Sequence, residues 1–331
     1  MAYTLAQFAK LETDPNKKYV LRNLLREIKA GEYLQFEDVS SLTVSGLKWR
    51  QLPSVAFRAL GDDYTEDTSG DVDSVWEGVY PFGGLVKFDR IYDKVSNTVV
   101  DPKRLQLDMK TLSMALTFND YLINGDHGTD VKAFEGLKKR VSLMPTRQKV
   151  IPTAASATAL DVTASAANVN AFWGKGMDKA FEYCNRGNVD LIITSEDMKL
   201  GLGRSLRYGN AAGGHFLDFG KDSFDRAVVQ YKGAPVIDIG IKADQSTEII
   251  TDTETAEDAG ADGTSMYFVS INKEQGVVGI QLGPLEVVPE AKKDVGTANQ
   301  TLIEWVCGLC GFGSYGVVRL QNILAPDTWT Y

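Results

Sequence analysis

Two extended limbs separated by an acidic segment restrict the fold of this chain more than any other sequence feature. The first limb is Leu47–Arg58, and the second is made of Val75–Tyr80 and Leu85–Tyr92. This pattern predicts a long β-hairpin with a charged tip. A lone hairpin is not stable in water, and this tip is too polar to be buried in the core of its own chain. The hairpin must therefore lie against another surface.

The net charge of −9 comes from two acidic segments. Residues 61–77 contain seven Asp and Glu with no Lys or Arg, and residues 242–262 contain seven that are opposed only by Lys242. Neither segment has the ligand spacing of a calcium-binding loop, so we interpret both as solvated, flexible loops. The overall negative charge disfavours general nucleic-acid binding, because such binding neutralises phosphates with Lys and Arg.

Cysteine and histidine usage exclude several kinds of site. Three cysteines, an odd number, exclude a secreted disulfide scaffold. Cys307 and Cys310 form a CxxC motif in a predicted strand, where the two side chains would point to opposite faces of the sheet. Only His127 and His215 are present, so a zinc site with several histidine ligands cannot form.

No motif in the chain predicts catalysis or nucleotide binding. The sequence lacks a Gly-x-Ser-x-Gly elbow and a Walker lysine motif. Gly311–Gly316 matches GxGxxG, but strand-like residues follow it instead of a helix, so it predicts a hairpin turn. We therefore expect no catalytic, cofactor-binding or metal site. No segment is apolar enough to span a membrane, and residues 1–12 do not look like a secretory signal, so we expect synthesis in a cytosol.

The strongest helix prediction is Asp101–Asn124, with Pro102 in the first turn and Gly125 at the end. A helix of this length, about 34 Å, needs an equally long partner along its apolar side. We expect that partner in two C-terminal strands, residues 301–309 and 315–324, joined by the glycine-rich turn. The mostly helical segment 3–30 is mildly basic and is expected to be an arm without a partner in its own chain.

The middle of the chain predicts a compact α+β module inserted into this elongated unit. Its first elements are a helix over residues 168–185, a buried strand over 189–194 and a helix capped by Ser195. The remaining strands are expected at residues 227–231, 236–239, 266–271 and 277–282.

Five segments carry a family resemblance through their order and spacing. They are Gly46–Arg58, Phe82–Ile91, Asp101–Gly125, Asp190–Thr194 and Gly233–Asp238. Together they resemble the tailed-bacteriophage major capsid proteins, whose shell fold is shared with encapsulins. The first two resemble the entry and exit of an extended loop, the third resembles the spine helix, and the last two resemble the axial domain.

The resemblance implies an α+β fold, the phage major capsid shell fold. Such a fold has a peripheral domain with a long spine helix on long antiparallel strands, an inserted axial α+β domain, an extended β-hairpin loop and an N-terminal arm. The expected division is an arm at residues 1–45, the extended loop at 46–100, the peripheral domain with the spine helix at 101–155, the axial domain at 156–284, and the C-terminal strands of the peripheral domain at 285–331.

The resemblance also implies a structural protein without enzymatic activity or cofactor. Its copies would form the pentamers and hexamers of an icosahedral shell around a viral genome, assembled in the host cytoplasm and located in the virion. Implied partners are portal and scaffolding proteins, with decoration proteins left open, and weak nonspecific contact with packaged DNA. Two alternatives remain: an encapsulin-like compartment that holds cargo enzymes, and a soluble nucleotide-using enzyme.

We expect the acidic tip to contact basic residues of a neighbouring copy, with its charges setting register more than strength. The residues expected in this contact are Asp62, Asp63, Glu66, Asp67, Asp71 and Asp73 on one side, and Lys138, Lys139, Arg140, Arg147 and Lys149 on the other.

The resemblance further raises a Lys–Asn isopeptide cross-link between subunits, which needs a neutral Lys and a nearby carboxylate base. Candidates are Lys87 and Lys94 near the loop base, with Asn322 and Glu304 on the terminal strands. No motif requires this reaction, and we interpret the two lysines as surface residues.

Overall fold

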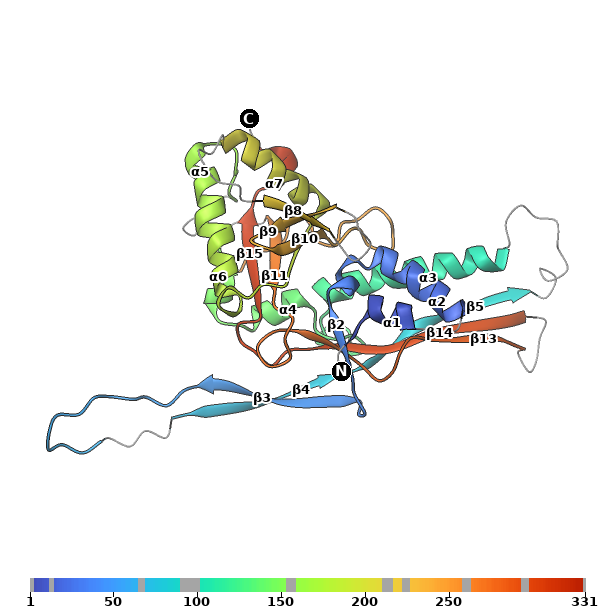
Figure 1. Ribbon diagram of the computed structural model, residues 1–331, viewed down its shortest axis with the longest axis horizontal. Helices are drawn as coiled ribbons and strands as arrows, with labels where there is room; N and C mark the ends of the chain where they lie inside the picture. The colour runs from blue at the N-terminus through green and yellow to red at the C-terminus, as the bar shows by residue number, and fades with distance from the viewer. Residues whose placement is uncertain are drawn as a thin grey trace.

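The computed structural model describes residues 3–11, 15–64, 69–89, 102–152, 159–209, 217–221, 227–257, 263–292 and 298–329. Two sheets and a projecting hairpin organise this part of the chain (Figure 1). The hairpin consists of β3 (Thr43–Gln51) and β4 (Asp71–Gly78), which pair only with each other among the described strands.

The first sheet has six strands in the order β1-β2-β12-β14-β13, with β5 paired to the other side of β14. Their bounds are β1 (Tyr3–Thr4), β2 (Gln35–Asp38), β5 (Tyr80–Asp89), β12 (Val278–Gln281), β13 (Glu286–Lys292) and β14 (Ala298–Cys310). Helix α3 (Pro102–Asn124) lies along one face of the long strands β5, β14 and β13 (Figure 1), which confirms the predicted long helix and its position on long antiparallel strands.

The second sheet has seven strands in the order β6-β15-β11-β7-β10-β9-β8. Their bounds are β6 (Lys149–Val150), β7 (Leu191–Thr194), β8 (Leu217–Lys221), β9 (Ala227–Tyr231), β10 (Ala234–Asp238), β11 (Thr264–Val269) and β15 (Val317–Ile323). The remaining helical segments are α1 (Leu5–Leu11), α2 (Pro15–Glu27), η1 (Lys29–Glu32), α4 (Leu137–Ser142), η3 (Thr146–Gln148), α5 (Ala166–Asn170), the π-helix η4 (Ala171–Asp178), α6 (Lys179–Tyr183), η5 (Asn185–Gly187), α7 (Glu196–Gly209) and η6 (Pro326–Thr328).

Several local predictions for the middle of the chain are confirmed. One continuous helical segment, α5 through η4 to α6, occupies the predicted helix, and β7 is fully buried. The Ser195 hydroxyl accepts a hydrogen bond from the Met198 backbone N–H at 3.2 Å, as a helix cap does. Lys232 and Gly233 both have positive φ, 48° and 87°, in the tight turn between β9 and β10.

The prediction that the two C-terminal strands form one hairpin is wrong. Strand β14 belongs to the first sheet, and β15 pairs with β11 and β6 in the second. The glycine-rich residues 311–316 are therefore a connector between sheets. Within this connector, an added Cβ on Gly313 would lie 2.2 Å from the Gln275 carbonyl oxygen, and one on Gly316 would lie 2.4 Å from the Gly276 Cα. Glycine is needed there because two backbones touch.

Strand β12 also departs from the prediction, because it was expected in the inserted module. It is antiparallel to β14, with Val278 opposite Cys310 at one end and Gln281 opposite Cys307 at the other, and it is parallel to β2 on its other side. The chain thus leaves the second sheet after β11, completes the first sheet with β12, β13 and β14, and returns to the second with β15.

The N-terminal segment packs on its own chain, contrary to the expectation of an arm without a partner there. Tyr19 Oη and Asn23 Nδ2 donate to Asp108 Oδ1 of α3 at 2.8 and 3.0 Å. Lys29 pairs with Asp238 of β10, which also binds Lys199 of α7. The apolar side of the segment is buried against the core, including Leu5, Val20, Leu21, Leu24 and Ile28.

The hairpin is shorter in regular structure than predicted. Strand β3 ends at Gln51, and residues 52–64 continue outside any strand, away from the body (Figure 1). The predicted second limb is divided between β4 and β5, because β5 leaves the hairpin and pairs with β14. In the described residues, no helix combines the length and apolar character that a bilayer crossing requires.

An aromatic cluster holds α3 against the first sheet. The Phe118 ring lies 5.4 Å from Trp305, 6.0 Å from Phe134 and 6.3 Å from Phe82, measured between centroids. Trp305 Nε1 donates to Gln281 Oε1 at 3.0 Å, so the one polar atom of that ring is satisfied. This cluster joins the helix, three strands and the loop after the helix.

Phe118→Ala should lower the free energy of unfolding by about 3–5 kcal/mol, because it leaves a cavity among these rings. Urea denaturation of the unassembled chain measures the change. Phe219→Ala is the matched control: Phe219 is 80% exposed on β8, so its loss should cost less than about 0.5 kcal/mol. Equal losses in the two variants would contradict the assigned core.

Candidate functional site

The base of the hairpin is fixed to the body by a buried ion pair. Arg140 Nη1 and Nη2 donate to Glu77 Oε1 and Oε2 at 2.6 and 2.9 Å, and Nη2 and Nε also donate to the carbonyls of Leu309 and Glu135, each at 3.0 Å. Arg140 is 6% exposed and Glu77 is 9% exposed. A bidentate ion pair whose guanidinium also donates to two backbone carbonyls has a defined geometry.

Two close approaches complete this attachment. An added Cβ on Gly46 of β3 would lie 2.3 Å from the Phe312 ring, so the ring rests directly on the strand backbone. An added Cβ on Gly308 of β14 would lie 2.4 Å from the Gly78 carbonyl oxygen. We call Glu77, Arg140, Gly46 and Phe312 the hairpin clamp. It fixes where the hairpin leaves the body.

The structure gives most of the predicted basic residues carboxylate partners within the same chain. Arg140 pairs with Glu77 as described, Lys138 Nζ with Glu254 at 3.1 Å, Lys139 Nζ with Asp126 at 3.4 Å, and Lys149 Nζ with Glu257 at 2.7 Å. Arg147 differs, because its guanidinium lies 4.2 Å from the centroid of the Tyr183 ring. The expected contact of these residues with a neighbouring copy stays a prediction.

The described residues of the predicted acidic set lie along the hairpin. Asp62 and Asp63 are exposed at the end of the hairpin, and Asp71 and Asp73 are exposed on β4. Glu66 and Asp67 lie outside the described residues. Glu77 of this segment does meet a predicted basic residue, Arg140, in the clamp.

The cross-link candidates are spread over both sheets. Lys87 is exposed on β5 opposite Gln300, and Glu304 of β14 lies between Gly83 and Glu286. Asn322 is fully buried on β15, in the other sheet. Lys94 lies outside the described residues. The structure does not bring Lys87 and Asn322 together in one chain, and a cross-link between copies stays a prediction.

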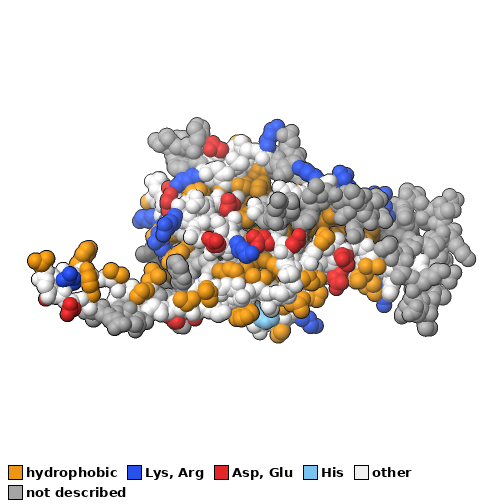
Figure 2. Space-filling model, turned by 60° about the horizontal axis from the view of Figure 1, so that its bottom comes forward, with side chains coloured by type: hydrophobic (Ala, Val, Ile, Leu, Met, Phe, Trp, Pro, Cys, Tyr) orange, Lys and Arg blue, Asp and Glu red, His pale blue; other side chains and the backbone are white. Residues whose placement is uncertain are grey.

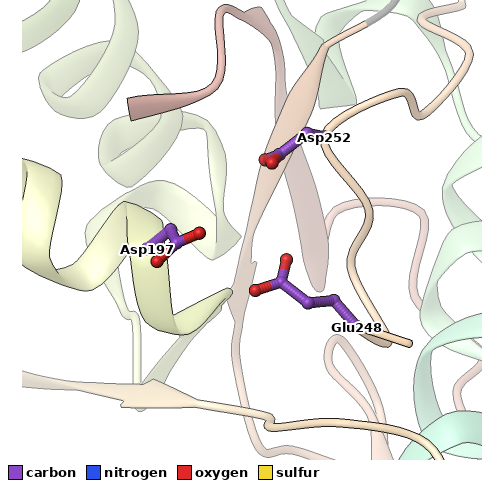
Figure 3. A group of neighbouring side chains, drawn as sticks. All are labelled: Asp197, Glu248 and Asp252. Atoms are coloured by element: carbon purple, nitrogen blue, oxygen red, sulfur yellow. The ribbon is translucent and has the colours of Figure 1, made fainter. Parts of the chain in front are cut away.

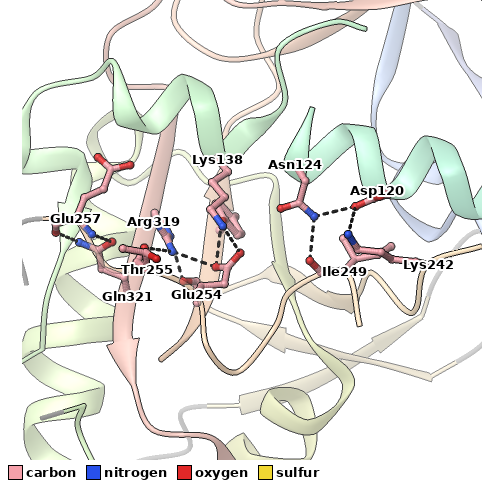
Figure 4. Close-up of polar contacts among 12 residues, drawn as sticks. Asp120, Asn124, Lys138, Lys242, Ile249, Glu254, Thr255, Glu257, Arg319 and Gln321 are labelled. Carbon is pink, nitrogen blue, oxygen red and sulfur yellow. Dashed lines mark hydrogen bonds and ion pairs between the residues drawn. The ribbon is translucent and has the colours of Figure 1, made fainter. Parts of the chain in front are cut away.

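The described part of the second acidic segment is only partly the solvated loop that its composition predicts, because residues 243–247 are exposed but Glu254 is buried. Glu254 is 3% exposed and accepts hydrogen bonds from Lys138 Nζ and Arg319 Nη2, each at 3.1 Å (Figure 4). Lys242 Nζ lies 3.4 Å from Asp120 Oδ1, and Asn124 Nδ2 donates to the Ile249 carbonyl at 3.0 Å. These contacts join the described part of the segment to α3, α4 and β15.

Three carboxylates gather at one point that the sequence analysis did not identify. Asp197 in the first turn of α7 and Glu248 and Asp252 of the acidic segment have oxygen atoms within 4.8 Å of one another, and their side chains point toward a common centre (Figure 3). Burial and the charges of Asp197, Asp252, Glu196 and Asp327 raise the pKa of Glu248 to about 7. Burial and the charges of Asp197 and Asp327 also raise the pKa of Asp252.

Two apolar surfaces are left exposed around the hairpin. On the sheet face opposite α3, the exposed Leu85 and Val288 and the half-buried Leu302 between them lie in one row across β5, β14 and β13. On the hairpin, Leu47, Val72 and Trp76 share the face that points away from the clamp, and each is more than half exposed. Figure 2 shows hydrophobic side chains across the underside of the body and again at the far end of the hairpin. We call Leu85, Leu302 and Val288 the sheet row, and Leu47, Val72 and Trp76 the hairpin stripe.

Arg140→Met should lower the free energy of unfolding by about 3–5 kcal/mol, because it leaves the Glu77 carboxylate buried without its partner. Glu77→Leu combined with Arg140→Met should recover much of the loss, because no buried charge remains. Urea denaturation measures both, with Arg147→Met as the control for an exposed arginine, expected within about 0.5 kcal/mol of the parent. A double variant as unstable as the single one would argue against the charge explanation.

Glu248→Gln should change how stability depends on pH. The pKa of Glu248 is raised in the folded chain, so its protonated form contributes stability below about pH 4.5 that is lost as the pH rises through about 7. The parent should therefore lose stability over this range relative to the variant, by about 1 kcal/mol because solvent screens a partly exposed group. Urea midpoints between pH 4 and pH 8 measure this, with Glu274→Gln as the control outside the cluster. Parallel pH profiles of the parent and Glu248→Gln would contradict the assignment.

Comparisons with known proteins agree with this architecture at the level of the fold. No protein-family model and no curated protein matches the sequence. Among solved structures, the SrpI encapsulin complex of Synechococcus elongatus PCC 7942 is similar at 13% identity and a TM-score of 0.61, over 100% of this chain and 99% of that one. The capsid of cyanophage A-1(L) is similar at 13% identity and a TM-score of 0.59, over 91% and 92% of the two chains. The capsid of Myoviridae phage XM1 is similar at 14% identity and a TM-score of 0.52, over 87% and 90%. The chain has the α+β shell fold that tailed-phage capsid proteins share with encapsulins.

Proposed function

We propose that this chain is the major capsid protein of a tailed bacteriophage, a structural protein whose copies form the pentamers and hexamers of an icosahedral shell around the viral genome. The observation that carries the proposal is the hairpin itself. It projects from the body, with the side chains of Val55, Phe57 and Leu60 almost fully exposed and that of Leu52 largely exposed. A soluble protein rarely presents such a surface unless another molecule covers it.

The two exposed apolar surfaces differ from each other, and this difference supports a closed assembly. The hairpin stripe lies on the projecting limb, and the sheet row lies on the body. A contact between two different surfaces of identical chains repeats from copy to copy and closes into rings when the rotation fits. Permanent assemblies bury roughly 2,000–5,000 Å² per interface, which an overlapping limb on a flat sheet can supply.

The packaged genome needs only weak, nonspecific contact with such a shell. The chain carries a net charge of −9, so attraction to DNA phosphates cannot drive filling. A portal protein is the partner that the proposal implies for filling, and a scaffolding protein would guide the shell, which closes from copies of the chain alone. The location that follows is the virion, after assembly in the host cytoplasm.

An encapsulin-like compartment is the second candidate. It is favoured by the match to the SrpI encapsulin complex, which covers nearly the whole of both chains. Both functions use the same fold and the same kind of assembly. They differ in the contents, which are nucleic acid in one and protein cargo in the other.

Size-exclusion chromatography and negative-stain microscopy of the purified chain test the assembly. We expect closed particles tens of nanometres wide. Leu47→Ser with Trp76→Ser should abolish them, because the hairpin stripe loses its apolar side chains, whereas Phe219→Ser, an exposed phenylalanine on β8, should not. A parent chain that stays a folded monomer would overturn the proposal.

Particles isolated from the native source separate the two candidates. Nuclease-protected DNA inside the particles supports the capsid, and a co-purifying enzyme without DNA supports the compartment. A ladder of multiples on a denaturing gel would in addition reveal the cross-link for which Lys87 and Asn322 are candidates.

A further inference from the structure

A cleft of about 530 Å³ lies beside the base of the hairpin. Its walls come from β3 of the hairpin, η3, the end of α6 with the turn that follows it, the turn at residues 274–275, and the connector between the two sheets. It combines cationic and aromatic side chains, while Glu182 and Glu274 lie on its wall. The cationic residues are Lys48, Arg147 and Arg186, and the aromatic residues are Tyr183, Phe312 and Tyr315.

The wall that carries Arg186 is held in an unusual conformation. Asn185 and Arg186 both have positive φ, 43° and 57°, which is uncommon for residues other than glycine. The Asn185 backbone N–H donates to the Tyr315 carbonyl at 2.8 Å, and its side-chain amide donates to Ser270 Oγ at 3.0 Å. Backbone strain of this kind persists where the surrounding contacts enforce it, often at functional sites. The cleft is therefore shaped before any ligand arrives.

Arg147 is the cation of the predicted basic set that remains directed to this cleft. Its guanidinium stacks on Tyr183, whereas Lys138, Lys139 and Arg140 are engaged with Glu254, Asp126 and Glu77 of the same chain. A guanidinium on an aromatic ring keeps its donors available at the ring edge for a carboxylate.

The end of the hairpin has the matching chemistry. Residues 59–62 form a turn in which the Asp62 N–H donates to the Ala59 carbonyl at 3.2 Å. Arg58 folds back, with Nη1 donating to the Asp62 carbonyl at 2.7 Å and its guanidinium 5.2 Å from the Tyr64 ring centroid. The turn presents the carboxylates of Asp62 and Asp63 beside the exposed Leu60 and Tyr64.

We propose that the cleft receives the hairpin end of a second copy of this chain. The carboxylates of Asp62 and Asp63 would meet Arg147 and Arg186, and the apolar side chains of the turn would lie against the aromatic wall. The contact is between copies because residues 52–64 extend away from the body of their own chain (Figure 1). This inference rests on the proposed shell function and adds to it the place where the hairpin ends.

Disulfide trapping tests the contact directly. In a chain carrying Asp63→Cys and Arg186→Cys, mild oxidation of the assembled protein should give a ladder of multimers on a non-reducing gel. The native cysteines do not interfere, because Cys184, Cys307 and Cys310 are buried and burial raises the pKa of each thiol. Asp63→Cys with Lys132→Cys is the matched control, since Lys132 is exposed but outside the cleft, and it should give no ladder.

Charge reversal gives an independent measurement. Arg147→Glu with Arg186→Glu should reduce the yield of particles about tenfold, and so should Asp62→Lys with Asp63→Lys, because like charges then face each other. All four substitutions together should restore most of the yield, because the charges are then exchanged on both sides of the contact. The substituted side chains are exposed, so circular dichroism should show a folded chain in every variant.

The outcomes distinguish this contact from the proposed function. Particles that form without a ladder from the cleft pair, or with an equal ladder from the control pair, overturn the cleft contact and leave the shell function standing. Failure of the fourfold variant to recover also counts against the cleft. If neither the parent nor the cysteine variants form particles, both the cleft contact and the shell function are overturned.

Discussion

The buried pair of Glu77 and Arg140 is the interaction on which the rest of the arrangement depends. A two-stranded limb has too little core to hold itself in one orientation, so its direction must come from its attachment. Burying two charges is costly and is tolerated only where the geometry is good and the remaining donors are satisfied. Arg140 meets this condition, because the Glu135 and Leu309 carbonyls accept two further N–H groups beside the two bound to Glu77. With Phe312 resting on Gly46, the limb leaves the body in a defined direction before any neighbour binds.

Local features of the fold could be predicted from the sequence, and pairings between distant segments could not. The long helix and the Ser195 cap follow from residues within a few positions of each other, and both are present. The prediction of a C-terminal hairpin was wrong because two strands joined by glycines have the same sequence pattern whether they pair together or belong to different sheets. The prediction of an arm without a partner in its own chain was wrong because that partner, Asp108 on α3, lies more than eighty residues away in the sequence.

In the candidate site too, the sequence predicts local features but not the contacts between distant residues. The charges in the sequence indicate an acidic segment and a basic cluster, and the structure joins Glu77 of the first to Arg140 of the second inside a single chain. Charge alone cannot say whether opposite residues meet within a chain or between chains, and it cannot distinguish a solvated Glu254 from a buried one. The carboxylate group of Asp197, Glu248 and Asp252 was missed because about fifty residues separate its two parts, each ordinary by itself.

The path of the backbone between the sheets has a mechanical consequence. Three strands of the first sheet, β12, β13 and β14, are inserted between β11 and β15, which are neighbours in the second. Neither sheet can be excised as a continuous piece of chain. A pull on β14 reaches β15 along covalent bonds, through the short connector whose glycines touch the turn at residues 275–276. In a shell wall built from copies of this chain, tension would thus be shared by both sheets of every copy, because the backbone transmits it from one sheet to the other independently of side-chain packing.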